Sequence, residues 1–254
     1  MILKTKTVIV TGASRGIGEA TARHFAALGA HVVLAARDAA RINSIAAELN
    51  GGDQSACAWP TDVADAAQMK SLIDATVAET GRMDLLVNNA GLIDPIARLG
   101  DSDPEEWGKI VDVNLKGVYH GLRYAVPVMV AQGGGTIVNI SSGAATSALE
   151  AWSHYCATKA AVLSLTRVAD REYRDQGIRV IGLSPGTVAT RMQEQIRSSG
   201  INPVSQLDWS AHIPAEWVAR SIEWLTTSAA DAYRGTDFSL KNDEGRNLVG
   251  LPLG

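Results

Sequence analysis

The chain has 254 residues, of which 46% are apolar and 20% charged, and its formal net charge is −4 at pH 7. This balance indicates a folded globular protein, and the mild negative charge argues against general affinity for nucleic acid. Since the sequence has no bilayer-length apolar run and no signal-peptide pattern at its start, we expect a cytoplasmic protein with no membrane partner.

Short apolar segments and longer amphipathic segments alternate along the whole chain. The short β-branched segments, bounded by turn residues, are typical of buried parallel strands. The longer segments, with apolar residues at helical spacing, are typical of amphipathic helices. The predicted strands cover residues 7–11, 31–35, 55–60, 84–87, 136–140, 179–183 and 236–240. The predicted helices cover residues 16–28, 39–49, 64–80, 104–131, 152–174 and 214–227.

This alternation predicts an α/β fold of the Rossmann-like, doubly wound kind, with a parallel sheet covered by helices on both faces. We expect one dinucleotide-binding catalytic domain over residues 1–254, because α/β domains often reach this length around one core. Ligands bind beyond the carboxyl ends of the strands in such sheets. The candidate functional residues therefore belong at the strand ends.

A glycine-rich loop, Thr11–Gly18 (TGASRGIG), directly follows the first predicted strand. Its glycines permit a sharp turn and a close approach to a pyrophosphate, and the following helix offers free N–H groups to the phosphates. A glycine loop alone is weak evidence, since turns collect glycine for structural reasons. Its position between a strand and a helix is the one that a dinucleotide requires.

The end of the second strand indicates which dinucleotide is preferred. An acid that would bind the ribose 2′-hydroxyl of NAD(H) is missing, because position 36 is alanine and Arg37 follows it. Arg37, together with Arg15 in the glycine loop, can bind a 2′-phosphate through paired hydrogen bonds. We therefore expect NADP(H) in preference to NAD(H), although Asp38, one residue later, complicates this interpretation.

Tyr155 and Lys159 are four residues apart in a predicted helix, so their side chains share one face. Ser142 follows the preceding strand. Carbonyl reduction needs a hydride donor, a proton donor and a group that stabilises the developing alkoxide. A tyrosine whose pKa is lowered by a nearby ammonium and by the oxidised nicotinamide can serve as the acid/base. Ser142 can donate a hydrogen bond to the substrate oxygen.

Two further motifs are NNAG at Asn88–Gly91 and PGTVAT at Pro185–Thr190. Together with the glycine loop, Ser142 and the Tyr155–Lys159 pair, they make the chain resemble the short-chain dehydrogenase/reductase family from about Thr7 to Thr190. The resemblance implies a seven-stranded parallel sheet, a catalytic tetrad of Asn114, Ser142, Tyr155 and Lys159, and a homotetramer or homodimer. Tyr155 and Lys159 would also contact the cofactor. The other cofactor-binding residues expected are Gly12, Ser14, Arg15, Gly16, Ile17, Gly18, Arg37, Asp62, Val63, Asn89, Ala90, Gly91, Pro185, Gly186, Val188 and Thr190.

The remaining regions are less informative. Residues 190–213 have no clear periodicity and are expected to form a substrate lid, as variable lids often lie there. Trp152 and Trp209 are pocket candidates, as are Asp94, Glu150 and Met192. The family's usual Asp-Gly-Gly turn is absent near residues 241–254, where Glu244 and Arg246 belong either to a solvated tail or to a contact with a neighbouring subunit's active site.

We expect no metal, because Cys57 and Cys156 lack metal-ligand spacing and the five histidines lack evident partners. The predicted function is NADP(H)-dependent interconversion of a small-molecule carbonyl and a secondary alcohol, such as a 3-oxoacyl thioester, a sugar-like polyol or a hydroxy-ketone. One alternative is a catalytically silent cofactor-binding or scaffold protein of the same fold. Another is a lyase such as a halohydrin dehalogenase, against which the intact glycine loop argues.

Overall fold

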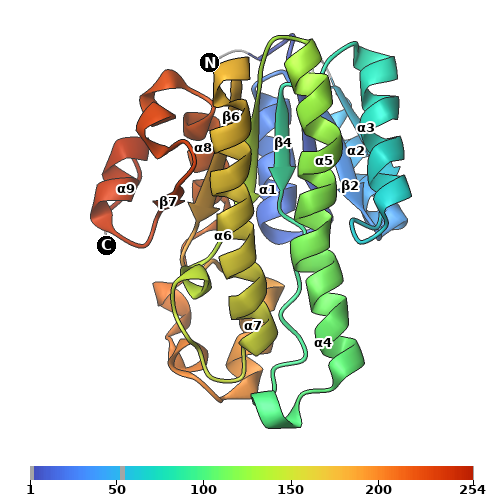
Figure 1. The fold of residues 1–254 in the computed structure, drawn as a ribbon. Helices are drawn as coiled ribbons and strands as arrows, with labels where there is room; N and C mark the ends of the chain where they lie inside the picture. The colour runs from blue at the N-terminus through green and yellow to red at the C-terminus, as the bar shows by residue number, and fades with distance from the viewer. Residues whose placement is uncertain (1–2, 52–54, 254) are drawn as a thin grey trace.

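The computed structural model describes residues 3–51 and 55–253. Its seven strands form one parallel sheet in the order β3-β2-β1-β4-β5-β6-β7 (Figure 1). The order reverses between β1 and β4, which opens a crevice at their carboxyl ends. The seven-stranded parallel sheet predicted from the sequence is confirmed. The strands are β1 (Thr7–Thr11), β2 (His31–Ala36), β3 (Ser55–Pro60), β4 (Leu85–Asn88), β5 (Gly135–Ile140), β6 (Ile178–Ser184) and β7 (Asp237–Ser239).

Helices cover both faces of the sheet (Figure 1). One apolar cluster joins the sheet to α1, α2 and α8, and a second joins the opposite face to α3, α5 and α6. The helices are α1 (Gly16–Ala27), α2 (Ala39–Leu49), α3 (Ala66–Thr80), α4 (Pro104–Val111), α5 (Gly117–Ala131), α6 (Ser153–Tyr173), α7 (Arg191–Ser199), α8 (Ala215–Leu225) and α9 (Asp243–Val249). Short 3₁₀ turns cover Leu99–Asp101, Gly143–Ala145, Arg174–Gln176, Pro203–Gln206, Trp209–Ala211 and Ser228–Tyr233.

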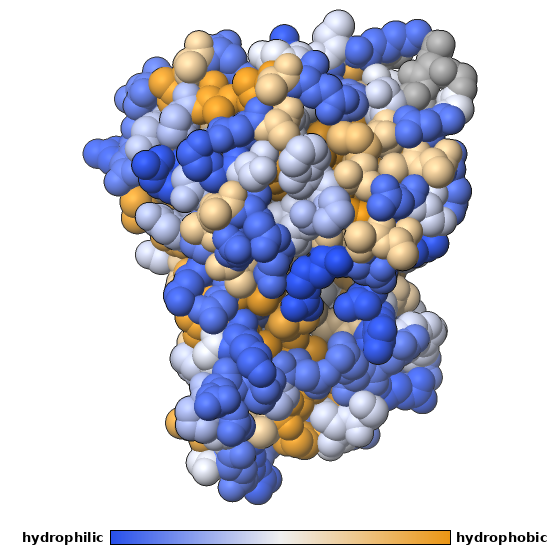
Figure 2. Space-filling view, turned by 90° about the vertical axis from the view of Figure 1, so that its right-hand side faces the viewer, coloured by the Kyte–Doolittle hydropathy of each residue, from blue (hydrophilic) through white to orange (hydrophobic). Residues whose placement is uncertain are grey.

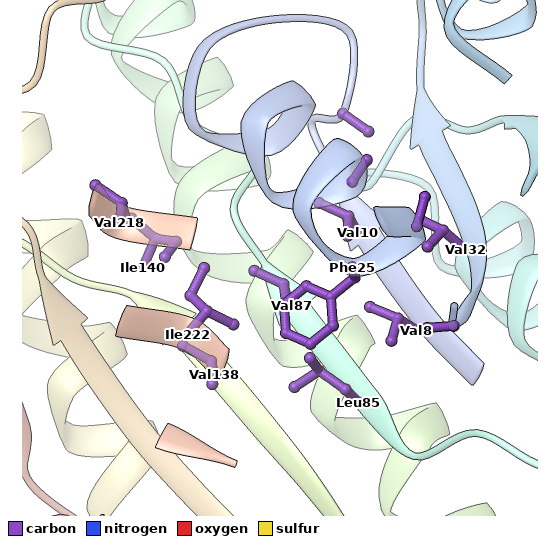
Figure 3. Packing of buried hydrophobic residues seen from close by; sticks show 14 of the residues in the cluster. Val8, Val10, Phe25, Val32, Leu85, Val87, Val138, Ile140, Val218 and Ile222 are labelled. Carbon is purple, nitrogen blue, oxygen red and sulfur yellow. The ribbon is translucent and has the colours of Figure 1, made fainter. Parts of the chain in front are cut away.

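The three central residues of strand β1, Val8–Val10, are all apolar because the strand is buried on both faces. Val8 and Val10 point into one cluster and Ile9 into the other, because successive strand side chains face opposite sides. Phe25 of α1 packs among Val8 and Val87 in the first cluster (Figure 3). A strand buried on both faces shows no alternation of polar and apolar residues. Its sequence therefore does not indicate which helix packs on which face.

The structure departs from the sequence prediction in three segments. The helical region expected over residues 104–131 is divided by a π-helical turn at Asp112–Lys116 between α4 and α5. Helix α7 lies where no periodicity was recognised, since it is short and buries only Gln193 and Ile196. Helix α9 covers residues for which the sequence left a solvated tail and a contact with a neighbouring subunit open. Within the described residues, no helix combines the length and apolar character that crossing a bilayer requires.

Candidate active site

A cavity of about 1160 Å³ lies at the carboxyl edge of the sheet. Its walls come from the segments that follow β1, β2, β3, β4, β5 and β6, and from α7. The volume exceeds the roughly 300–1,000 Å³ typical of a site for one drug-sized ligand. The space-filling view shows apolar residues exposed between hydrophilic rims where the molecule narrows below its midpoint (Figure 2). The cavity is large enough for a dinucleotide and a small substrate together.

The glycine loop forms one wall of this cavity and is tightly packed. Gly12 has φ +65°, and a Cβ there would lie 2.9 Å from the Cα of Ala90. A Cβ on Gly18 would lie 2.2 Å from the carbonyl oxygen of Gly12. Helix α1 begins at Gly16 without a side-chain cap, which leaves its first N–H groups available. The loop and the uncapped helix end therefore fit a bound pyrophosphate.

Arg15 and Arg37 are both exposed and line the cavity. Among the described residues, neither guanidinium has a hydrogen bond or an ion pair, whereas the nearby Arg41 pairs with Glu19 at 2.8 Å. Asp38, the complicating acid, also lines the cavity, but one of its carboxylate oxygens caps α2 by accepting a hydrogen bond from the Arg41 N–H at 3.0 Å. This contact gives Asp38 a structural role at the helix start.

Thr11 is a buried residue of this region that sequence reasoning missed. Its hydroxyl donates to the carbonyl oxygen of Val87 at 3.2 Å and accepts from the N–H groups of Asn89 and Ala90 at 3.0 and 3.2 Å. The Asn89 amide donates to the Thr11 carbonyl oxygen at 2.8 Å. Together these bonds join the ends of β1 and β4. The Thr-Gly start of the loop was the only sequence signal for this role.

Tyr155 and Lys159, in α6, line the cavity together with Ser142, which follows β5. The Lys159 ammonium lies 5.5 Å from the centre of the Tyr155 ring and donates a hydrogen bond to the carbonyl oxygen of Ile140 at 2.7 Å. Both side chains are buried, with 8% of Tyr155 and 5% of Lys159 exposed. The expected shared helix face is confirmed.

The pKa of Tyr155 depends strongly on its burial. Burial raises it to about 12, and the hydrogen bond with Ser142 only partly opposes this shift. Burial also lowers the pKa of Lys159 to about 8, which Asp237 partly opposes. The expectation that Lys159 and the oxidised nicotinamide together lower the tyrosine pKa concerns the protein with cofactor bound and stays a prediction; burial acts against it, because desolvation disfavours the charged form of both groups.

Asp237 of β7 is a second residue that sequence reasoning missed. Its carboxylate accepts a hydrogen bond from the Ser141 hydroxyl at 2.7 Å, and burial raises its pKa. Its other oxygen, Oδ1, is buried without a hydrogen-bond partner among the described residues. The nearby Lys159 ammonium partly offsets the cost of this buried charge. No motif marked this residue, because β7 is short and pairs only with β6 along the sheet edge.

Asn114 lies outside the cavity wall and is fully buried in the π-helical turn. Its Oδ1 accepts a hydrogen bond from the Leu92 N–H and its Nδ2 donates to the Leu92 carbonyl oxygen, both at 2.8 Å. Both polar atoms of the amide thus hold the segment that follows Gly91. Since Gly91 and Leu92 line the cavity, Asn114 supports its wall from behind.

The structure gathers nearly all the predicted cofactor-binding residues around this one cavity. Gly18 is the exception, because it packs beneath the loop. Of the other pocket candidates, Glu150 lies outside the wall and pairs with Arg98 at 2.7 Å. Trp152, Trp209, Asp94 and Met192 do line the cavity, as do Gly12, Ser14, Arg15, Gly16, Ile17, Arg37, Asp62, Val63, Asn89, Ala90, Gly91, Pro185, Gly186, Val188 and Thr190.

The carboxyl-terminal segment also contributes to this cavity. Arg246 and Lys241 line it in the same chain, and Arg246 donates a hydrogen bond to the Leu240 carbonyl oxygen at 2.9 Å. The Arg246 guanidinium also lies 5.8 Å from the centre of the Trp217 ring. Glu244 is exposed outside the wall. The solvated-tail interpretation was therefore wrong for Arg246, which α9 holds against its own subunit.

Comparison with known proteins agrees with this architecture. A family model described as short chain dehydrogenase matches residues 6–200. A 3-oxoacyl-[acyl-carrier-protein] reductase from Synechocystis sp. is 35% identical over 235 residues, which covers 91% of this chain and 93% of that protein. A cyclohexanol dehydrogenase from Acinetobacter sp. is 30% identical over 236 residues, which covers 92% of each. The crystal structure of levodione reductase matches with a TM-score of 0.87 at 26% identity, over 97% of this chain and 98% of that one.

The chain therefore belongs to the short-chain dehydrogenase/reductase family, as its motifs predicted. It is an oxidoreductase of the class that acts on alcohol and carbonyl groups with a nicotinamide dinucleotide.

Proposed function

We propose that this protein interconverts a carbonyl compound and a secondary alcohol with NADP(H), and that Tyr155 exchanges the proton. The observation that carries the proposal is the grouping of the Tyr155 phenol, the Lys159 ammonium and the Ser142 hydroxyl on one wall of the cavity that the glycine loop also lines. A silent scaffold would have no need for a buried lysine beside a buried tyrosine, since both carry a desolvation cost.

The nicotinamide, when bound, supplies the hydride for reduction and accepts it during oxidation. In reduction, the Tyr155 hydroxyl donates its proton to the carbonyl oxygen, and a raised pKa keeps that proton in place until the oxygen gains charge. Lys159 stabilises the phenolate that remains, and its pKa of about 8 allows it to return a proton near neutral pH. Ser142 holds the substrate oxygen, while Asn114 keeps the neighbouring wall in position.

The preference for NADP(H) rests on Arg15 and Arg37, whose guanidinium groups are unpaired among the described residues and border the cavity. Fluorescence titration should give tighter binding of NADPH than of NADH. Arg37→Ala should weaken NADPH binding at least tenfold and leave NADH binding nearly unchanged, since only NADPH carries the 2′-phosphate. Arg41→Ala is the matched control, because Arg41 is bound to Glu19 and lies outside the cavity wall. Equal affinities of the wild-type protein for the two cofactors would contradict the preference.

The substrate end of the cavity favours a carbonyl compound with an apolar body. Ile93, Trp152 and Ile196 form a buried apolar cluster around Tyr155, and Leu149, Met192 and Val204 pack against it. All six side chains line the cavity. An apolar wall stabilises a hydrocarbon ring or chain but leaves polyol hydroxyls without partners. The cyclohexanol dehydrogenase and the levodione reductase among the similar proteins agree with this preference.

A carbonyl panel followed at the nicotinamide absorbance tests the activity. We expect turnover of cyclohexanone-like ketones to exceed that of an acetoacetyl thioester, and oxidation of a sugar-like polyol to be slowest. Tyr155→Phe should abolish turnover and retain NADPH binding, whereas Tyr173→Phe, at the last residue of α6 and outside the cavity wall, should behave like the wild-type protein. Undiminished turnover in Tyr155→Phe would identify another proton donor. No turnover of any compound by the wild-type protein would favour the scaffold alternative.

We also propose that residues 190–213 act as a substrate lid, and that the protein forms a homotetramer or homodimer. Helix α7 and the 3₁₀ turns after it border the substrate end of the cavity, which supports the first proposal. Tyr119 on α5 and Val168 on α6 expose 50% and 48% of their surface, which favours burial by another subunit. Light scattering during gel filtration should give twice or four times the chain mass of 26.8 kDa.

A further inference from the structure

Three side chains with metal-binding atoms meet at the end of the sheet opposite the cavity. His31 is the first residue of β2, Cys57 is the third residue of β3, and Glu79 lies in the last turn of α3. The parallel pairing of β2 with β3 sets His31 beside Ser55 and Val33 beside Cys57, so both ligand positions lie near the amino ends of their strands. The cavity borders the carboxyl ends. The cluster is therefore separate from the active site.

The distances between the three ligand atoms suit one small ion. The His31 Nε2 lies 3.8 Å from the Cys57 Sγ and 4.0 Å from a Glu79 carboxylate oxygen, and all three atoms lie within 4.8 Å of one another. An ion in the plane of the three atoms and equidistant from them would lie about 2.5 Å or less from each atom, whereas typical zinc bonds are about 2.0–2.1 Å to nitrogen and about 2.3 Å to sulfur. With a fourth ligand the ion lies out of this plane, so the three ligand atoms must come about half an ångström or more closer together, a movement that rotation of the exposed Glu79 side chain can largely supply.

A neighbouring hydroxyl already orients the imidazole for this role. The His31 Nδ1 lies 2.7 Å from the Ser55 hydroxyl oxygen. When Nδ1 carries the proton and donates it to Ser55, the lone pair of Nε2 points towards Cys57 and Glu79. Metal-binding histidines usually have a partner of this kind on their other nitrogen, because it fixes both the tautomer and the ring orientation. Four residues from three elements thus form a ligand set with its supporting hydrogen bond.

We propose that His31, Cys57 and Glu79 bind one Zn²⁺ ion, with water as the fourth ligand. Imidazole, thiolate and carboxylate are the ligands that zinc takes in proteins, whereas a thiolate selects against Mg²⁺ and Ca²⁺. Binding forms bonds from zinc to Nε2, Sγ and a carboxylate oxygen, and the thiol proton leaves to solvent. The Glu79 side chain is 56% exposed and that of His31 is 20% exposed, so an ion has access from solvent.

The proposed ion would join β2, β3 and α3, and none of its ligands lines the cavity. Its expected effect is therefore on stability, because a ligand that binds only the folded state shifts the folding equilibrium. Sequence spacing gave no sign of this site, since the ligands are separated by 26 and 22 positions and are brought together only by the parallel pairing of β2 with β3 and by the packing of α3.

Titration of the chelator-stripped full-length protein with Zn²⁺ tests the proposal. Calorimetry should give one saturable ion per chain, and the melting temperature should rise with zinc. Co²⁺ in its place should give the near-ultraviolet absorption of a thiolate-to-metal charge transfer. Cys57→Ser, His31→Gln and Glu79→Gln should each weaken zinc binding at least tenfold. The matched controls, Cys156→Ser and Glu105→Gln, should bind zinc like the wild-type protein.

Glu79→Gln decides the outcome if the other two variants fold poorly, because Glu79 is at the surface and its amide replacement is nearly isosteric. Absence of saturable zinc binding would overturn the proposal and leave His31 and Glu79 as an ion pair. Binding that survives in Glu79→Gln with unchanged affinity, or a Co²⁺ complex without the thiolate band, would overturn it equally. Excess Mg²⁺ should not compete with zinc, and competition would contradict the thiolate ligand.

Discussion

The Lys159 ammonium lies 5.5 Å from the centre of the Tyr155 ring, and burial moves the pKa values of these two groups in opposite directions, so that they lie further apart than their ordinary values. It raises that of Tyr155 to about 12 and lowers that of Lys159 to about 8. Below pH 8 the pair therefore holds a phenol and an ammonium, which is the state required for donating a proton to a carbonyl oxygen. Near neutral pH, the lysine is the member of the pair closer to its titration point.

Replacing Asp237 should lower the Lys159 pKa further. The carboxylate favours the ammonium and partly opposes the effect of burial, so Asp237→Asn should move the titration of Lys159 below pH 8. Carbon-13 NMR of labelled lysine side chains can follow this titration, and the Lys159 signal is identified by its loss in Lys159→Met. Asp231→Asn, at an exposed carboxylate paired with Arg179, should leave the Lys159 signal unchanged. A wild-type Lys159 that titrates near 10.5 would contradict the role given to burial.

Introducing an acid at position 36 should shift the cofactor preference towards NAD(H). Ala36 ends β2 and lines the cavity beside Arg37, so a carboxylate there would repel a 2′-phosphate and accept hydrogen bonds from a 2′-hydroxyl. In Ala36→Asp, the ratio of NADPH to NADH affinity should fall at least tenfold, or about 1.4 kcal/mol. Fluorescence titration with both cofactors measures it. An unchanged ratio would mean that the ribose binds elsewhere.

The sequence predicted the sheet and the cavity residues because their determinants are local. A glycine loop after a β-branched strand, or a tyrosine and lysine four positions apart, can be recognised without knowing the tertiary contacts. Asp237 could not be found in this way, since its importance arises where β7 meets β6 and carries its carboxylate beside Lys159. The opposing effect of burial on the Tyr155 pKa was missed for a related reason, because charge proximity is visible in spacing and the depth of burial is not.

Helix α7 shows a different limit. Its nine residues, RMQEQIRSS, are mostly polar and contain a single apolar pair at helical spacing, Met192 and Ile196, which is too short a pattern to recognise in the sequence. Met192 and Ile196 pack in the apolar cluster around Tyr155, so the helix is placed by residues that are distant from it in the sequence. Segments that border a binding site are often of this kind, because part of their surface is reserved for a ligand that the sequence does not contain.

Gly18→Ala should destabilise the protein and weaken cofactor binding. The new methyl group would lie 2.2 Å from the carbonyl oxygen of Gly12 and 2.6 Å from the Asn89 amide, so the loop would have to move away from α1. Overpacking of this kind costs about 1–3 kcal/mol of unfolding free energy. Gly108→Ala is the control, because a Cβ there meets nothing within 4 Å and alanine favours the helix by about 0.5–1 kcal/mol. Urea denaturation and NADPH titration measure the two effects, and wild-type values for Gly18→Ala would contradict the packing argument.

Asn114→Asp should impair both stability and turnover, although the two side chains have nearly the same shape. The amide donates to the Leu92 carbonyl oxygen at 2.8 Å, and a carboxylate would place a second acceptor against that oxygen in a fully buried site. Leaving one buried group unsatisfied costs about 1–3 kcal/mol, and a buried charge costs more.

The control variant Asn43→Asp loses a similar bond, from its amide to the Ala39 carbonyl oxygen at 2.8 Å, but in an exposed position where water replaces it. We therefore expect unfolding free energies of wild type and Asn43→Asp to agree within about 0.5 kcal/mol. Asn114→Asp should fall well below both, with a reduced kcat because the Gly91–Leu92 wall loses its support. Equal stability of the two variants would show that Leu92 does not depend on Asn114.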